Sequence, residues 1–128
     1  MRTVVVRVTR TDGTSPVARM ALRTPAFGPF APGVPWWGCH HLRDALSWFG
    51  SRAGDYLWAL VVCDASQLLE HRERREVVVH GPGNVVWSGG FDELATAAAS
   101  PLMTFARRHK AWVRLRRMAL RLDSETAG

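Results

Sequence analysis

The chain has 128 residues and a formal net charge of +6, with 17 arginine and lysine residues against 11 aspartate and glutamate residues. This length suits one domain with one core, and a hydrophobic content of 47% excludes a largely disordered chain. The longest apolar run, residues 57–63, is about a third of the roughly 20 residues that a membrane-spanning helix needs, and the first residues lack the apolar block of a secretory signal. We expect a cytoplasmic protein with a single domain at residues 1–122 and a flexible tail at residues 123–128.

Two strands and a long loop are predicted in the first third of the chain. Residues 3–10 alternate in part between valine and polar side chains, a pattern typical of a half-buried strand. A turn at Asp12-Gly13 and a second strand candidate at residues 17–22 predict an opening hairpin. Residues 24–38 hold four prolines and three glycines, which favour an ordered loop anchored by its aromatic side chains.

The middle of the chain predicts a short helix, a buried strand and a second hairpin. Apolar residues at helical spacing indicate a helix at residues 40–49, which Gly50 ends. The continuous apolar segment at residues 56–63 suits a strand that is buried on both faces at the centre of a sheet. Residues 64–72 predict a turn or short helix, and residues 76–80 and 84–87 predict a hairpin around Gly81-Pro82-Gly83.

Two helices are predicted at the end of the sequence. Residues 92–99 are rich in alanine and begin with acidic residues, which favours a helix start. Ser100-Pro101 ends this helix and begins another, predicted to reach about Leu122, because serine is a good cap and proline a good first residue. The elements together predict an α+β fold, in which a small, mainly antiparallel sheet of about five strands has a short central helix and carries the C-terminal helices on one face.

The final predicted helix carries nearly all of the excess charge. Residues 101–128 hold seven basic and two acidic residues, whereas residues 1–100 hold ten basic and nine acidic residues. At 100° per residue, five basic residues lie on one narrow line about 20 Å long, which we call the basic stripe. The basic stripe consists of Arg107, Lys110, Arg114, Arg117 and Arg121. The other side of the helix is apolar and presents Leu102, Phe105, Ala106, Trp112, Val113, Ala119 and Leu120.

The basic stripe has two main interpretations. Arginine suits bidentate contacts with phosphates and carboxylates, so the stripe is a candidate surface for binding a nucleic acid or an acidic protein. Alternatively, it is a solvated face, or its charges are paired within the fold by Glu70, Glu73 and Glu76. Binding at a membrane surface is disfavoured, because the apolar side of the helix is expected to belong to a core.

Residues that could carry metal or nucleophilic chemistry are scattered. Cys39, His40 and His41 are consecutive, but together with the later cysteine and histidines they match no paired spacing of a structural zinc site. We therefore predict no metal, and two free, buried cysteines. Trp36 and Trp37 either anchor their loop or stack on a base, so they join His40 and His41 as secondary binding candidates.

Residues 38–80 resemble an uncharacterised small domain found in phages and bacteria. In that domain a glycine, an aromatic residue or cysteine, and a histidine precede a short helix. The matching sequence here is Gly38-Cys39-His40-His41, followed by Leu42, Ala45 and Trp48, a strand at residues 56–62, and Arg75-Glu76-Val77-Val78. The resemblance covers about a third of the chain. It implies no known activity and is consistent with an accessory protein of a phage or mobile element.

The order of elements is also similar, more distantly, to single-domain ADP-ribosyltransferases, and the best matching fragment is residues 76–83. This resemblance implies that Arg23 holds the phosphate side of NAD. It also implies that Glu73 or Glu76 orients the ribose hydroxyl and stabilises an oxocarbenium-like transition state. The serine-threonine-serine element of that family is missing, and His40-His41 occupies its approximate place.

The sequence therefore favours a non-catalytic accessory protein that needs no cofactor and binds an acidic macromolecule, nucleic acid or protein, through the basic stripe. A homo-oligomer is compatible with the sequence. The alternative is a transferase-like enzyme that uses NAD.

Overall fold

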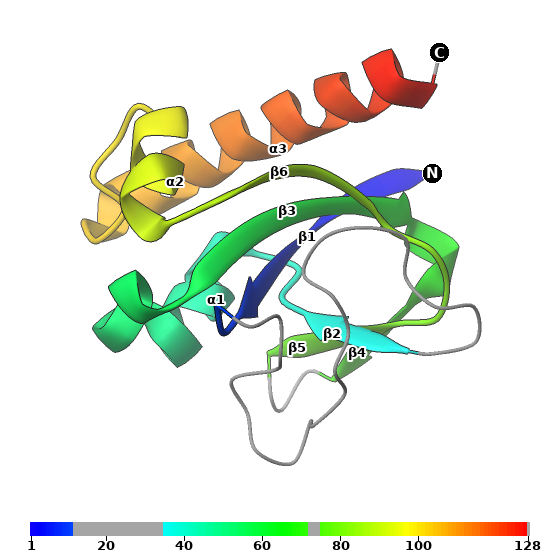
Figure 1. Cartoon of the computed structure of the whole chain (residues 1–128), viewed down its shortest axis with the longest axis horizontal. Helices are drawn as coiled ribbons and strands as arrows, with labels where there is room; N and C mark the ends of the chain where they lie inside the picture. Colours follow the sequence, from blue (N-terminus) through cyan, green and yellow to red (C-terminus); the bar gives the residue numbers. More distant parts are fainter. Residues whose placement is uncertain (12–34, 72–74, 128) are drawn as a thin grey trace.

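The computed structural model describes residues 1–11, 35–71 and 75–127 of the chain (Figure 1). The strands described are β1 (Arg2–Thr9), β2 (Trp36–Gly38), β3 (Leu57–Asp64), β4 (Leu68–His71), β5 (Glu76–Val79) and β6 (Asn84–Gly89). The α-helices are α1 (Leu42–Phe49), α2 (Phe91–Ala97) and α3 (Phe105–Ala127), and two short 3-10 segments are η1 (Gly50–Asp55) and η2 (Ala65–Gln67). The predicted α+β class is confirmed. The strand predicted at residues 17–22 lies outside the described residues, as does most of the predicted loop. None of the described helices is both long and apolar enough to cross a membrane.

The described strands form two antiparallel sheets of three strands each, and not one sheet of about five. The first sheet has the order β1-β3-β6 and the second has the order β2-β5-β4. The hairpin predicted at residues 76–87 is wrong, because β5 pairs with β4 and β2 whereas β6 pairs with β3. The Gly81-Pro82-Gly83 segment therefore passes from one sheet to the other. The local hairpin is instead formed by β4 and β5. The turn or short helix predicted at residues 64–72 is confirmed at η2, but the second half of that range is strand β4.

The first sheet lies between the helices and the second sheet (Figure 1). Side chains alternate between the two faces of a strand. In β1, Val4 and Val6 pack in one core with residues of the helices, including Leu115, whereas Val5 packs in a second core with Val79 of the second sheet. The prediction of a half-buried strand here is therefore wrong, because residues 3–9 are all buried. The prediction of a central strand buried on both faces is confirmed, since β3 is the middle strand and its residues 58–63 are all buried.

Strand β2 corrects the prediction of an uninterrupted loop at residues 24–38. Trp36 pairs with Val79 of β5, and its indole N–H donates a hydrogen bond of 2.9 Å to the carbonyl oxygen of Gly81. Gly38 allows β2 to lie close against β1, because a Cβ atom there would overlap the side chain of Val5 and lie 2.9 Å from the Val6 carbonyl oxygen. These pairings join residues far apart in the sequence, so the local proline and glycine content did not predict them.

Helix α3 begins and ends later than the sequence predicts. It starts at Phe105, four residues after Pro101, and the carbonyl oxygen of Thr104 accepts hydrogen bonds from the backbone N–H groups of residues 107 and 108. Its fully buried residues begin at Ala111, so the predicted apolar side is wrong for Phe105, which is 84% exposed, and for Ala106, which is also exposed. Leu102 is buried in the turn before the helix.

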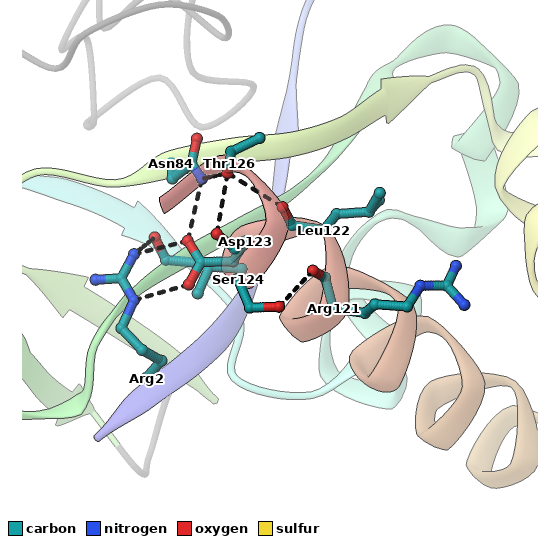
Figure 2. A network of polar contacts seen from close by, with 8 residues as sticks. Arg2, Asn84, Arg121, Leu122, Asp123, Ser124 and Thr126 are labelled. Atoms are coloured by element: carbon teal, nitrogen blue, oxygen red, sulfur yellow. Dashed lines mark hydrogen bonds and ion pairs between the residues drawn. The ribbon is translucent and has the colours of Figure 1, made fainter. Parts of the chain in front are cut away.

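Hydrogen bonds to the buried carboxylate of Asp123 hold the last turns of α3 against the first sheet (Figure 2). The Asp123 carboxylate accepts hydrogen bonds of 2.9 and 3.0 Å from the guanidinium of Arg2 in β1, and one of 3.0 Å from the Asn84 amide in β6. Thr126 adds a hydroxyl that accepts from the same amide at 3.1 Å. These contacts are made by residues of the predicted tail, 123–128, so α3 continues to Ala127 where the sequence predicts a helix end at about Leu122.

Candidate functional site

All five residues of the basic stripe are exposed along α3. Arg121 lies 4.0 Å from Glu125, one turn later on the same helix. The other four residues form no ion pair with the described part of the chain. In the alternative interpretation, Glu70, Glu73 and Glu76 pair with the stripe. Among the described residues, Glu76 is buried in β5 and forms no ion pair with a stripe residue. Glu73 lies outside the described residues, and the side chain of Glu70 is not described.

The stripe lies opposite the face by which α3 packs on the first sheet. Ala111, Leu115 and Ala119 are fully buried against the sheet and recur every four residues, which is one line along a helix. Two arginines of α3 that lie off the basic stripe behave differently from one another. Arg108 is half-buried and donates to the carbonyl oxygen of Met103 at 3.1 Å, whereas Arg116 extends into solvent.

Arg116 and Arg117 also line a groove between α3, the start of β5 and the start of α1. The groove has a volume of about 980 Å³, at the upper end of the range of about 300–1,000 Å³ found for ligand sites. Arg43 from α1 and Arg75 from the residue before β5 complete a set of four lining arginines. Arg117 belongs to both the groove and the basic stripe, so the two cationic surfaces are continuous.

Two carboxylates lie among these arginines. Asp44 is 3.9 Å from Arg43, and Glu76 is 8% exposed. With four arginines and two carboxylates, the groove keeps two positive charges in excess when its histidines are neutral.

Arg75 has a backbone φ of 53°, a left-handed conformation that is uncommon for a residue with a side chain.

Three histidines line the groove, and two of them face each other. The rings of His41 and His109 have centroids 6.4 Å apart and are within 13° of parallel. The His41 ring also packs on the ring of Trp112, with centroids 5.5 Å apart. Trp112 is buried and His41 is half-buried against it. His109 is exposed. The pair offers planar surfaces at the wall of a cationic groove.

The hydrogen bonds of His41 define what this side chain can do. His41 is the N-cap of α1, and its Nδ1 accepts a hydrogen bond of 3.1 Å from the backbone N–H of Arg43. An imidazole whose Nδ1 accepts is neutral and carries its proton on Nε2. Burial, followed by the charge of Arg43, lowers the pKa of His41, which favours the same neutral form. His41 is therefore a fixed hydrogen-bond donor, and its capping role leaves it no free nitrogen to act as a general base.

The structure brings only some of the sequence-predicted site residues together. His40 and His41 line the groove beside Arg117. Trp36 is fully buried between the sheets and offers no surface for stacking, whereas Trp37 is half-buried in β2. Of the residues implied by the transferase resemblance, Glu76 lines the groove, but Arg23 and Glu73 lie outside the described residues.

The two cysteines are free and buried, as the sequence predicts. They belong to different cores, since Cys39 packs with the helices and Cys63 packs between the sheets. Burial raises the pKa of Cys39 to about 12 and that of Cys63 to about 11, which makes both thiols poor nucleophiles. Within the described ranges, no group of three or more histidine, cysteine, aspartate or glutamate side chains is arranged to hold a metal ion.

The groove itself was missed by sequence reasoning. Arg43, Arg75 and Arg116 are separated by more than thirty residues in each step and share no periodicity, so no pattern linked them. The one sequence feature that could have indicated the groove was Arg116, a basic residue of the helix that lies off the basic stripe. Comparison with protein-family models, with curated proteins and with solved structures finds no match for the chain.

Proposed function

We propose that this protein is a non-catalytic accessory protein that binds an acidic macromolecule through the basic stripe of α3. The observation that carries this proposal is the exposure of all five stripe residues on a helix whose opposite face is packed into the core. Holding the helix in place fixes the spacing of the cations before binding, which lowers the entropic cost of an interface.

Electrostatic repulsion along the stripe supports the same proposal. Like charges at helical spacings of three and four residues destabilise a helix by a few tenths of a kcal/mol per pair. Apart from the 4.0 Å contact between Arg121 and Glu125, the described residues supply no acidic partner to relieve this repulsion. A polyanion that lies along the helix would relieve it, and guanidinium groups match phosphate and carboxylate geometry.

The test is a titration of fluorescently labelled polyanions in about physiological salt, using a single-stranded oligonucleotide, a duplex and a polyglutamate peptide as probes. In the variant R107Q/R114Q/R117Q/R121Q the affinity for the bound probe is expected to fall at least about 100-fold, because four charge contacts are lost. Circular dichroism verifies that the helix content is retained. The proposal is contradicted if wild-type protein binds none of the probes, or if the variant binds as tightly as wild type.

A charge-matched comparison separates the stripe from net charge alone. The variants R107Q/R114Q and R10Q/R52Q each remove two exposed arginines, the first pair on the stripe and the second pair away from it. The stripe pair is expected to weaken binding about tenfold or more, while the second pair changes it less than about twofold. Equal losses in both variants would assign the binding to nonspecific attraction by net charge.

The NAD-dependent transferase is the alternative that the sequence resemblance implies. Its one support among the described residues is the position of Glu76 in the wall of a groove large enough for a dinucleotide. It predicts cleavage of NAD that is lost in Glu76→Gln. Absence of NAD binding at millimolar concentration dismisses it.

A further inference from the structure

We propose that the groove between α1, β5 and α3 binds a short segment of single-stranded nucleic acid. This inference rests on the proposed function and names its partner class, with the basic stripe continuing the path of the phosphate backbone beyond the groove.

The first support is the arrangement of charge. Arg43 of α1, Arg75 of the turn before β5 and Arg116 of α3 are all exposed at the groove, and Arg117 connects them to the basic stripe. Cations that converge on a concave surface from several elements fit a flexible backbone that curves through it. His41 adds a neutral donor, because its Nδ1 accepts from the backbone N–H of Arg43 and its proton is therefore on Nε2.

The second support is the presence of planar rings at the same wall. An acidic peptide requires only cations for its carboxylates, whereas unstacked bases also require planar groups on which to stack. Histidine rings and arginine guanidinium groups both provide such planes. His41 and His109 are within 13° of parallel, and Trp112 holds His41 from the buried side. This combination favours nucleobases over carboxylate side chains.

The concave shape of the groove favours single-stranded nucleic acid over a duplex. In a duplex the base faces are stacked on one another and cannot reach a ring at the wall of a groove. A volume of about 980 Å³ exceeds what a single phosphate ion needs and suits a few nucleotides. Duplex DNA is therefore expected to contact the basic stripe alone.

The experiment compares four labelled probes by fluorescence anisotropy at one salt concentration: a single-stranded 12-mer, its duplex, an abasic strand of the same length, and a polyglutamate peptide. Wild-type protein is expected to bind the single strand at least about tenfold more tightly than the abasic strand, because only the former provides stacking bases. His109→Ala, which truncates an exposed side chain, is expected to reduce this preference to less than about threefold.

Two variants with the same change of charge separate the groove from the stripe. R43Q/R75Q/R116Q removes three groove arginines that lie off the stripe, and R107Q/K110Q/R114Q removes three stripe residues that lie off the groove. The groove variant is expected to weaken single-strand binding at least about tenfold and to change duplex binding less than about twofold. The stripe variant is expected to weaken both.

The outcomes distinguish this inference from the proposed function. If the stripe variant weakens every probe while the groove variant weakens none, the proposed function stands and the groove inference is overturned. It is equally overturned if the abasic strand or the polyglutamate peptide binds as tightly as the single strand. If wild-type protein binds no probe at all, both proposals fall.

Discussion

Replacing Asp123 by asparagine tests the contact that holds α3 against the first sheet. The carboxylate side chain is 7% exposed and accepts two hydrogen bonds from Arg2, whose own side chain is 46% exposed. A fully buried ion pair that loses one partner costs about 3–5 kcal/mol, but the exposed half of Arg2 keeps part of its hydration, which reduces the loss to about 1–2 kcal/mol. Asparagine keeps an oxygen at the Oδ1 position, which accepts from both Asn84 and Arg2, but it places an amide donor opposite the Nε–H of Arg2, so the variant removes the negative charge and one of the two Arg2 hydrogen bonds. We expect Tm to fall by about 3–10 °C.

The dependence of this loss on pH follows from the pKa of Asp123. The hydrogen bond from Arg2, with a further one from Asn84, lowers that pKa below its ordinary value of 3.8 despite the opposing effect of burial. A carboxylate with a depressed pKa binds fewer protons in the folded state, so its stabilising contribution is complete well above pH 3.8 and is lost as pH falls through the lower folded-state value. The difference in stability between wild type and Asp123→Asn should therefore be constant near neutral pH and shrink below about pH 4.

Urea unfolding followed by circular dichroism measures both effects. Glu125→Gln is the matched control, because it removes the same charge from an exposed contact of 4.0 Å with Arg121 and should change the free energy of unfolding by less than about 0.5 kcal/mol. A double-mutant cycle with Arg2→Gln isolates the pair. The reasoning is refuted if Asp123→Asn costs no more than Glu125→Gln, or if the cycle gives a coupling free energy near zero.

Two further predictions concern packing and the thiols. Gly38→Ala should destabilise the fold by about 1–3 kcal/mol in urea unfolding, because the new Cβ would overlap the side chain of Val5. Gly54→Ala is the control and should be nearly neutral, because among the described residues no neighbouring atom lies within 4 Å of the new Cβ. Equal effects of the two substitutions would contradict the close approach of β2 to β1. Both cysteines should resist alkylation at pH 8 until the protein unfolds, since burial raises their pKa values to about 12 and 11; rapid modification of the native protein would show that a thiol is accessible.

Local patterns predicted the elements better than they predicted the pairing between them. The apolar run of β3 and the partly alternating valines of β1 predicted the two long strands, although the second face of β1, with Arg7 and Thr9, is buried where the pattern predicted exposure. Strand β2 left no such trace, since its stability comes from Trp36 pairing with Val79, 43 positions later, and not from its own composition. The wrong hairpin at residues 76–87 has the same origin, because a turn sequence does not reveal which strands its neighbours join.

The candidate site divides in a similar way. The basic stripe is a property of one helix, so a period of 3.6 residues was enough to predict its line and its exposure. The groove depends on how α1 and β5 meet α3, and the alignment of His41 with His109 depends on a tertiary contact across 68 positions of sequence. Asp123 was missed because its partners, Arg2 and Asn84, lie on other strands.

The most direct test of the central claim is the salt dependence of binding to a single-stranded oligonucleotide. Each phosphate contact contributes a slope of about −0.7 to a plot of log affinity against log salt concentration. Replacing Arg107, then Arg114, then Lys110 by glutamine should make the slope shallower by about 0.7 at each step, whereas R10Q/R52Q should leave it at the wild-type value. A slope that does not change as the stripe is dismantled would contradict the binding role of α3.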